Sequence, residues 1–270
     1  MEAKKLKPGT EDGRTRRLYY EDSHMREFDA QVLDCRKHGE RWLVRLDQTA
    51  FFPEGGGQCA DTGVLTVEGG EQAAVYDVQE REGEIVHETG SPLEVGSTVH
   101  GILDWEQRFS NMQQHTGEHI VSGLVHRMYG YDNVGFHLGR DEVTMDFNGL
   151  FPEGALEEIE EKANKAVWDN LAVLASFPDK EELERIEYRS KLNLDEGVRI
   201  VTIPGVDACA CCAPHVSRTG EIGCIKIADS QHYKAGTRVT ILCGTRALAD
   251  YQKKQESVRK ISILLSAKQE

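Results

Sequence analysis

The stretch Glu106–Tyr129, EQRFSNMQQHTGEHIVSGLVHRMY, divides a β-rich sequence from one in which helices and strands alternate. Its apolar residues recur at near-helical spacing and Gly130 follows as a stop signal, so the stretch predicts an amphipathic helix. His115 and His119 lie in the middle of this helix, four residues apart. That spacing puts two imidazoles on one face of a helix, where both can reach one metal ion.

Cys211 and His215 form a second pair with the same spacing, about ninety residues further along the chain. Pro214 directly precedes His215 and is poorly tolerated inside a helix, so we expect this pair in a tight loop after a strand at Arg199–Ile203. One thiolate and three imidazoles are donors that Zn²⁺ takes in tetrahedral sites. We therefore predict one Zn²⁺ held by four residues: His115, His119, Cys211 and His215.

Spacing alone does not choose the thiolate, because Cys209, Cys211 and Cys212 all lie close to His215 in the sequence. These three and Cys224 are four of the seven Cys, and they fall within sixteen residues. The N-terminus lacks the apolar core of a secretory signal, so reduced thiols or metal ligands are favoured over disulfides. The expected compartment is the cytosol. No apolar run reaches membrane-spanning length, so no membrane anchor is expected.

Four protein ligands would fill a tetrahedral zinc site, whereas catalysis needs an open position for water. Three arrangements reconcile these demands: one ligand is loosely held, the ion becomes five-coordinate, or the metal mainly shapes the pocket. The simplest alternative to a metal site is a helix with incidental His residues beside a buried, inert cluster of Cys. Two matched pairs of ligands favour the metal.

The chain divides into four parts by pattern. Met1–Arg17 is polar and is expected to be a disordered leader. Short apolar runs separated by Gly and charged turns fill 18–104, and they predict a small β-barrel or sandwich. Strands and helices alternate over 105–245, which predicts an α+β domain that carries the zinc site. Within it, further helices are expected at Pro152–Ala175 and Lys180–Ser190.

Residues 246–270 predict one long helix with a rough heptad of apolar side chains. Its apolar stripe has no evident partner in the chain. We expect this helix to begin a C-terminal region that is missing from the sequence, which allows a homodimer through that region.

The segment Gly55-Gly56-Gly57-Gln58 is the third signal. Three consecutive Gly allow positive φ and a close approach of the backbone to a ligand, so their N–H groups could bind a carbonyl or an anion. No Lys-Ser/Thr follows, so the segment is not a P-loop. A flexible hairpin turn is an equally good interpretation from physics alone.

Two further observations constrain the function. His115-Thr116-Gly117-Glu118-His119 also matches the inverted zinc-peptidase signature, with Glu118 as general base, but that interpretation leaves Cys211 and His215 unexplained. The formal net charge of −14 argues against a broad nucleic-acid surface, and leaves room only for a local basic strip.

Together, the chain resembles the editing domain of alanyl-tRNA synthetase and its freestanding relatives, the alanyl-tRNA editing proteins. The resemblance lies in a Gly-Gly-Gly-Gln motif, then His-x-x-x-His, then Cys-x-x-x-His, in this order. Arg108 and Met112 before the first pair also fit, as do Val216 and Thr219-Gly220 after the second. The similarity covers roughly Leu18 to Leu248, and no synthetase catalytic domain precedes it.

The motifs depart from the synthetase pattern at three places. The second ligand motif reads Cys-Cys-Ala-Pro-His, where the synthetase usually has Cys-Gly-Gly-Thr-His. Gly117-Glu118 replaces Ala-Thr between the first two His, and Cys59 follows Gln58 where Pro is common.

The resemblance implies a fold and an activity. The fold would be a small N-terminal β-barrel followed by an α/β sandwich editing domain with a zinc site, and then the C-terminal helix. The activity would be hydrolysis of the ester that joins serine, or glycine, to tRNA(Ala), with His115, His119, Cys211 and His215 acting through Zn²⁺. Thr116, Gly56, Gly57 and Gln58 would bind substrate, with Thr116 and Gln58 the candidates for the serine hydroxyl. A zinc peptidase and a non-enzymatic, zinc-stabilised binding module are the alternatives.

Overall fold

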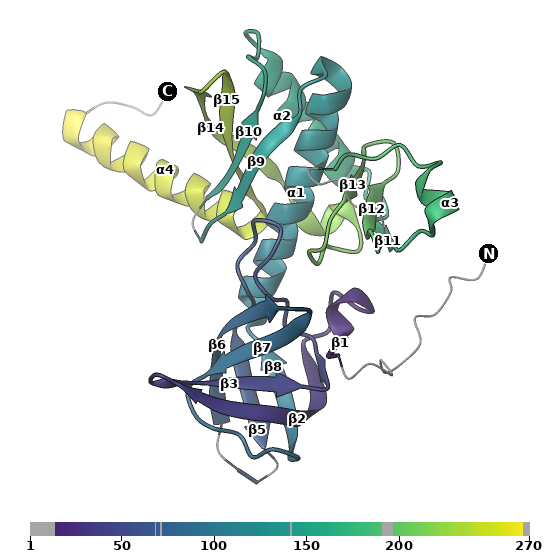
Figure 1. The fold of residues 1–270 in the computed structure, drawn as a ribbon. Helices are drawn as coiled ribbons and strands as arrows, with labels where there is room; N and C mark the ends of the chain where they lie inside the picture. The colour runs from purple at the N-terminus through teal and green to yellow at the C-terminus, as the bar shows by residue number, and fades with distance from the viewer. Residues whose placement is uncertain (1–13, 68, 71, 141, 191–196, 267–270) are drawn as a thin grey trace. The chain divides into compact units, whose positions relative to one another are not determined.

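The computed structural model describes residues 14–266 except 68, 71, 141 and 191–196. The chain folds into two compact units, which Figure 1 shows in purple to blue and in teal to yellow. The first unit is Met1–Asn111 with the loop Cys212–His215, and the second is Met112–Cys211 with Val216–Glu270.

The first unit contains a closed barrel of six strands, in which every neighbouring pair is antiparallel. Around the barrel the order is β2 (Glu27–His38), β3 (Arg41–Leu46), β7 (Glu84–Thr89), β6 (Gln72–Arg81), β5 (Gly63–Val67) and β8 (Thr98–Leu103). Buried and exposed residues alternate along β2 and β8, because successive side chains of a strand point to opposite faces. The prediction of a small N-terminal β-barrel is therefore confirmed.

The end of the expected leader is ordered. β1 (Arg16–Arg17) pairs in parallel with β4 (Gln48–Thr49), and Thr15 Oγ1 donates a hydrogen bond of 2.7 Å to the Leu46 carbonyl. The prediction of disorder is wrong for Thr15–Arg17, since a polar sequence can still pair its backbone with a neighbouring strand. Residues 1–13 of the expected leader lie outside the described residues.

A buried ion pair joins the barrel to the first turns of helix α1 (Trp105–Tyr129) inside the first unit. Arg108 and Asp61 have side chains that are fully buried, and Arg108 Nε and Nη2 donate to Asp61 Oδ2 at 2.9 and 2.6 Å. The same oxygen accepts the Phe52 N–H at 2.7 Å, and Arg108 Nη1 donates to the Ser23 carbonyl at 3.0 Å. Burying both charges is tolerable because each finds several partners.

His87 is a second buried polar group of the barrel, with 0 % of its side chain exposed. Its Nε2 lies 2.9 Å from Thr49 Oγ1 and its Nδ1 lies 3.2 Å from the Val44 carbonyl. Burial lowers the pKa of His87 to about 4, although the hydrogen bond to the carbonyl of Val44 works in the opposite direction. The ring is therefore neutral in the folded barrel at neutral pH.

This burial predicts acid sensitivity of the barrel. An unfolded chain protonates His87 below about pH 6.5, whereas the folded one resists until about pH 4, so stability falls as the pH falls through that window. Protonation of His87 is expected to lower the free energy of unfolding by about 3 kcal/mol between pH 7 and pH 4. Urea unfolding of the protein and of His87→Gln at both pH values measures it. An equal loss in the two proteins would contradict the prediction, since other groups titrate in both.

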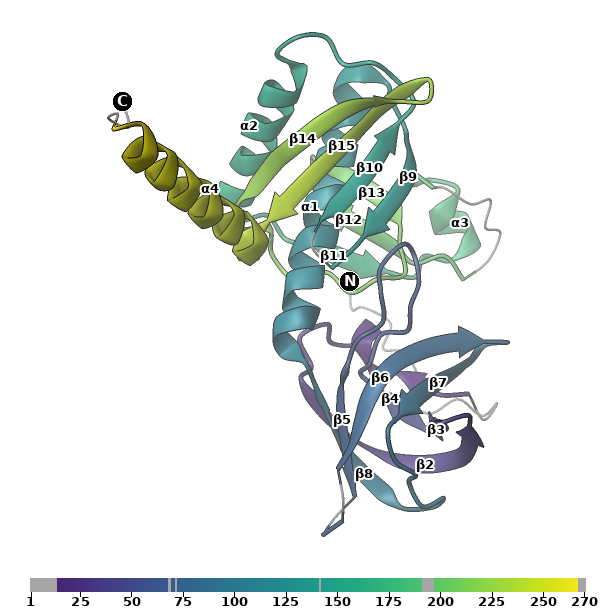
Figure 2. The ribbon, with the colours of Figure 1, turned by 90° about the vertical axis from the view of Figure 1, so that its left-hand side faces the viewer.

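The second unit is built on a four-stranded antiparallel sheet in the order β14-β15-β10-β9. Its strands are β14 (Ile225–Tyr233), β15 (Gly236–Cys243), β10 (Val143–Phe147) and β9 (Asn133–Leu138). Helices α1 and α2 (Ala155–Trp168) lie against this sheet (Figure 2). Gly117 of α1 allows close packing, because a Cβ there would lie 2.3 Å from Cys243 Sγ. The helix predicted at Glu106–Tyr129 and the α+β class are confirmed.

Helix α2 is shorter than predicted at both ends. Gly154, with φ +80°, precedes it in a left-handed conformation, so the chain turns into the helix only at Ala155. Asn170, with φ +49°, follows its last turn and ends it, as residues in the left-handed region commonly do. The residues predicted as the end of this helix form strand β11 (Leu174–Ser176) instead.

A small antiparallel sheet, β11-β12-β13, carries the second ligand motif. β12 (Ile200–Ile203) confirms the predicted strand, and β13 (Asp207–Ala210) returns beside it and leads directly into Cys211. Helix α3 spans only Lys180–Leu183, where a helix to Ser190 was predicted. None of its residues is buried, so it lacks the packed face that sustains a longer helix.

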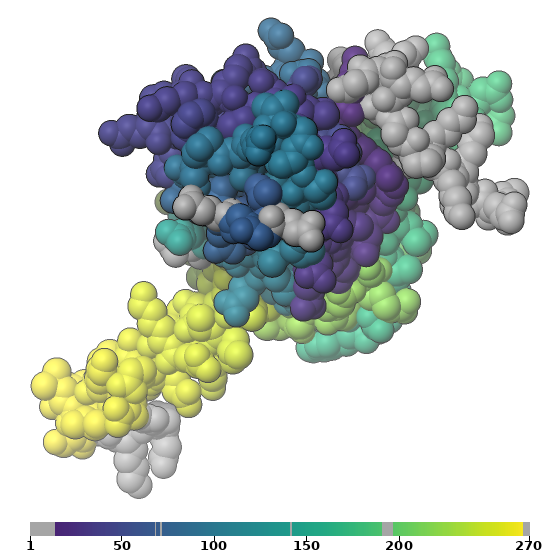
Figure 3. Space-filling view, turned by 90° about the horizontal axis from the view of Figure 1, so that it is seen from below, coloured from purple at the N-terminus to yellow at the C-terminus, as the bar shows by residue number. Residues whose placement is uncertain are grey.

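Helix α4 (Gly244–Leu265) confirms most of the predicted C-terminal helix, and its last predicted residues, 267–270, lie outside the described residues. Ala247 is its only buried residue among those described. Helix α4 is the yellow rod in Figure 3. Its large apolar side chains are exposed: Leu248, Tyr251, Val258, Ile261, Ile263, Leu264 and Leu265. Among the described helices, none is long and apolar enough to cross a lipid bilayer.

Candidate metal centre

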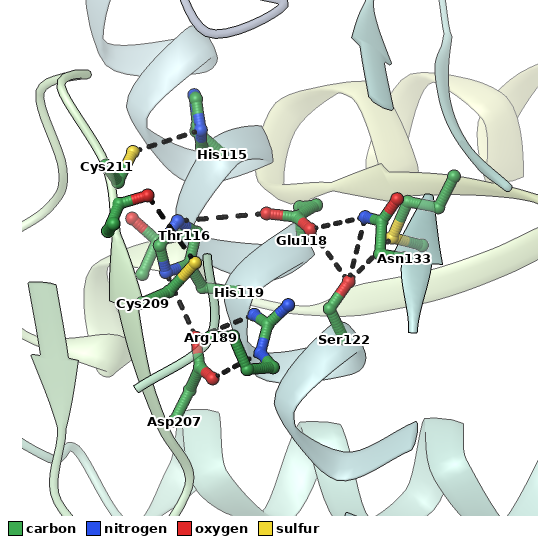
Figure 4. A network of polar contacts seen from close by, with 12 residues as sticks. His115, Thr116, Glu118, His119, Ser122, Asn133, Arg189, Asp207, Cys209 and Cys211 are labelled. Carbon is green, nitrogen blue, oxygen red and sulfur yellow. Dashed lines mark hydrogen bonds and ion pairs between the residues drawn. The ribbon is translucent and has the colours of Figure 1, made fainter. Parts of the chain in front are cut away.

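Helix α1 places the first two candidate ligands. His115 and His119 are both buried, and their ring centroids lie 5.6 Å apart on one face of the helix. Cys211, directly after β13, brings its Sγ to 3.5 Å from His115 Nε2 (Figure 4). The sequence prediction that these residues converge is thus matched by the geometry.

His215 completes the group. One potential ligand atom from each of His115, His119, Cys211 and His215 lies within 4.8 Å of the others. The loop Cys212–His215 is short and is bonded at both ends to the second unit, through Cys211 and Val216, so its position is tied to them. Three imidazoles and one thiolate, all in largely buried residues, are a donor set that suits Zn²⁺.

The three neighbouring Cys have different surroundings. Cys209 is buried in β13, and burial raises the pKa of its thiol. Cys212 is exposed, and its Sγ would lie 3.3 Å from a Cβ built on Gly56. Cys211 is the Cys that groups with the three His, so the geometry favours it as the thiolate.

A carboxylate lies on the other side of the His119 ring. Asp207, the first residue of β13, places its Oδ2 3.2 Å from His119 Nδ1. Arg189 holds the same carboxylate through two hydrogen bonds, Nε to Oδ1 at 2.8 Å and Nη2 to Oδ2 at 2.9 Å. Burial alone would lower the pKa of His119, but the hydrogen bonds to Asp207 and Cys211 outweigh it and hold that pKa well above its usual value.

Glu118 is buried but lies in a separate part of the network. Its Oε1 accepts hydrogen bonds from Ser122 Oγ and Asn133 Nδ2, both at 2.7 Å, and its Oε2 lies 3.8 Å from His119 Nε2. The carboxylate is therefore held in place beside the candidate metal ligands, rather than exposed on the helix surface.

Three ring-bearing side chains near the cluster have different surroundings. Phe136 of β9 packs on His115 with ring centroids 4.9 Å apart, which limits rotation of that imidazole. His137, the next residue, is exposed. His126, two turns beyond His119, pairs with Asp132 at 3.0 Å and does not join the cluster.

The Gly-rich motif forms a tight turn. Gly55 N–H donates to the Gln58 carbonyl and Gln58 N–H donates back to Gly55, both at 3.0 Å. Gly56 and Gly57 between them have φ of +60° and +82°, which a side chain would strain. Within the described part of the chain, neither N–H group donates a hydrogen bond to a backbone carbonyl. Both interpretations of the segment, hairpin turn and oxygen-binding backbone, are thus compatible with the same geometry.

Thr116 and Gln58 are buried, with 0 and 1 % of their surface exposed. The Thr116 hydroxyl donates to the Met112 carbonyl at 2.8 Å and accepts the Val216 N–H at 3.3 Å. These contacts fix its rotamer and tie α1 to the residue that follows His215.

Sequence reasoning missed Asp207, Arg189, Asn133 and Phe136 because none of them belongs to a recognisable motif. One signal was available. Gly123 lies one turn after His119, and a Cβ there would lie 2.7 Å from both the Asp207 Cβ and the Val206 carbonyl oxygen. A Gly inside a helix costs about 1 kcal/mol relative to Ala, so it hints at a neighbour that must approach closely.

Comparison with known proteins agrees with the motifs. Residues 9–107 match the family described as tRNA synthetases class II (A), and residues 198–260 match the threonyl and alanyl tRNA synthetase second additional domain. The chain is 38 % identical over 242 residues to the alanyl-tRNA editing protein AlaX-L of Pyrococcus horikoshii, which covers 86 % of this chain and 59 % of that protein.

Synthetases are similar over nearly the whole chain. The alanine--tRNA ligase of Pyrococcus furiosus is 38 % identical over 266 residues, covering 93 % of this chain and 28 % of the ligase. The ligase of Ignicoccus hospitalis is 36 % identical over 266 residues, covering 95 % of this chain and 29 % of the ligase. The chain thus spans 59 % of the editing protein and under a third of each of these two ligases. The resemblance seen in the ligand motifs is confirmed: the chain is similar to the freestanding alanyl-tRNA editing proteins and to part of the alanine--tRNA ligases.

Proposed function

We propose that the chain is a zinc-dependent trans-editing hydrolase that deacylates mischarged tRNA(Ala), chiefly Ser-tRNA(Ala) and secondly Gly-tRNA(Ala). The observation that supports it best is the convergence of His115, His119, Cys211 and His215 in a chain similar to an alanyl-tRNA editing protein. Both features are needed, because the ligand cluster does not identify the substrate and the similarity does not identify the groups that carry out hydrolysis.

The cluster suits ester hydrolysis. A bound Zn²⁺ would supply a Lewis acid that polarises the ester carbonyl or lowers the pKa of water. The chain's own residues would position the substrate around it: the N–H groups of Gly56 and Gly57 suit an oxygen, and the Gln58 amide and the Thr116 hydroxyl suit the serine hydroxyl. An aminoacyl ester is reactive in itself, so positioning contributes much of the rate.

Room for a ligand exists beside the polar network of the second unit. A hollow of about 1130 Å³ is lined by Asp207, Arg189, Cys209, Asn133 and Arg127, among others. Its wall carries the guanidinium groups of Arg127 and Arg189, but also the carboxylates of Asp132, Glu187 and Asp207, so it is not a basic surface.

The test is a deacylation assay with purified protein on Ser-tRNA(Ala) and Ala-tRNA(Ala). We expect hydrolysis of the seryl ester at least about tenfold faster than the alanyl ester, because a pocket that pairs with a hydroxyl leaves polar groups unpaired when alanine binds. Equal rates would refute the discrimination, and cleavage of peptides without deacylation would favour a peptidase instead. Zinc retention with neither activity would favour a binding module.

Thr116→Val sharpens the same assay, because valine keeps the shape of threonine and removes the hydroxyl. The expected narrowing of the Ser/Ala ratio is about fivefold, the worth of one hydrogen bond of about 1 kcal/mol. Thr116→Ser is the matched control, since it keeps the hydroxyl that binds Met112 and Val216. A ratio unchanged in Thr116→Val would remove Thr116 from the specificity pocket.

A further inference from the structure

We propose that Asp207 is a positioning residue for the metal centre: clamped by Arg189, it fixes the His119 ring so that Nε2 faces the ligand cluster. The inference concerns metal binding, and it rests on the proposed zinc centre but not on the tRNA substrate. Asp207 itself would not touch the metal or the ester.

The contact between His119 Nδ1 and the Asp207 carboxylate supports this role. Nδ1 lies 3.2 Å from Asp207 Oδ2, so the ring proton belongs on Nδ1 and the lone pair on Nε2. His119 and Asp207 each have 2 % of the side chain exposed, so water does not compete for this contact. A His that donates one ring N–H to a carboxylate is held in one tautomer and becomes a more basic metal ligand.

Arg189 fixes the carboxylate in turn. Its guanidinium donates two nearly parallel hydrogen bonds to Asp207, from Nε and Nη2. Such a fork determines the plane of the carboxylate as well as its place. Both carboxylate oxygens of Asp207 are thus in contact with a cationic or N–H group, Oδ1 with Arg189 and Oδ2 with Arg189 and His119.

The backbone is shaped for this contact. Arg189 N–H donates to the Ala208 carbonyl at 2.8 Å, and Ala210 N–H donates to the Arg189 carbonyl at 2.9 Å, so Arg189 is fastened to β13. On the other side, Gly123 of α1 leaves the space that the Asp207 Cβ needs, 2.7 Å from where its own Cβ would be. The approach of α1 to β13 and the Asp207–His119 contact therefore depend on each other.

The experiment measures zinc affinity by competition with a chromogenic chelator, and needs no tRNA. Asp207→Asn keeps the size of the side chain and removes its charge. In either orientation of the amide, its NH2 group faces an N–H donor of Arg189 or His119, so one acceptor of the native contact is lost. We expect zinc to bind about 10- to 100-fold more weakly. Asp146→Asn is the matched control, because Asp146 holds Arg238 through two hydrogen bonds of 2.6 and 2.8 Å in the same unit. Its zinc affinity should stay within about twofold of the parent.

Thermal unfolding of the zinc-free proteins separates positioning from folding. If the substitution affects only stability, the melting temperature falls, but zinc affinity measured at temperatures where the variant is folded stays at the parental value. If Asp207→Asn folds poorly, Arg189→Lys keeps the charge and loses the fork, and should weaken zinc binding by a smaller factor than the Asn variant. Parental zinc affinity in a folded Asp207→Asn, or equal losses in Asp207→Asn and Asp146→Asn, would overturn the proposal.

The same measurements keep this proposal apart from the proposed function. If the parent binds zinc but does not deacylate Ser-tRNA(Ala), the editing function fails while the role of Asp207 can still hold. If the parent deacylates and Asp207→Asn binds zinc normally, only the positioning role fails.

Discussion

Replacement of both His115 and His119 by Ala is expected to abolish zinc binding and to slow Ser-tRNA(Ala) deacylation by at least about a thousandfold, or about 4 kcal/mol of barrier. Loss of two of four ligands leaves an incomplete site, and the remaining Cys211 and His215 would bind zinc only weakly. Metal analysis of the purified variant and single-turnover deacylation check the two parts independently.

The matched control is His126→Ala on the same helix. His126 pairs with Asp132 outside the cluster, so its loss should leave zinc content and deacylation unchanged. Cys211→Ser and Cys212→Ser identify the thiolate, and only the first is expected to release zinc. Full zinc content in the double His variant would refute the assignment of the site. Release by Cys212→Ser alone would move the thiolate to Cys212.

The second large effect concerns stability of the barrel. Asp61→Ala should lower the free energy of unfolding by about 3–5 kcal/mol, because it leaves the Arg108 guanidinium buried without its counter-charge. It also removes the acceptor of the Phe52 N–H. Urea denaturation followed by circular dichroism measures the loss.

A double variant tests whether the unpaired charge is the cause. Asp61→Leu with Arg108→Met replaces both charges by apolar groups, so it should recover much of the stability lost in Asp61→Ala. Asp29→Ala is a control for a surface carboxylate of the same barrel, because Asp29 is itself exposed, its ion-pair partner His100 is half-buried, and such surface pairs contribute little. A loss below about 1 kcal/mol in Asp61→Ala would show that the pair is unimportant.

The features that were predictable from the sequence share one property: the signal lies within a few residues. The six strands, helix α1 and the two ligand pairs each follow from local periodicity or from an i, i+4 spacing. The order of the motifs then identified the family resemblance. Convergence of the two pairs could be predicted without the fold, because one ion with four ligands would require it.

What could not be predicted depends on partners distant in sequence. Asp207 pairs with His119 from a strand eighty-eight residues further along, and a single Asp gives no pattern. Thr15–Arg17 looked like a disordered tail because the carbonyls that it pairs with belong to 46–49. The failure at Lys180–Ser190 is the opposite case, in which a favourable composition lacked a surface to pack on.

Helix α1 has a further consequence for how the protein folds. Its buried residues include many polar ones, and Gln114 forms two hydrogen bonds with the backbone of Cys243: Gln114 Nε2 donates to the Cys243 carbonyl at 2.9 Å, and the Cys243 N–H donates to Gln114 Oε1 at 2.8 Å. Gln113 likewise donates to the Glu221 carbonyl at 2.9 Å. These partners are more than a hundred residues later in the sequence.

During synthesis on the ribosome, α1 therefore emerges long before the strands that satisfy it. Loop closure over such separations is slow, so native docking of α1 comes late in the folding of the second unit. Until Cys243 has left the ribosomal exit tunnel, Gln114 lacks its backbone partner, so His115 and His119 lie on a helix that is not yet docked on its sheet. Vectorial synthesis thus makes the candidate metal centre one of the later parts of the second unit to reach its native arrangement.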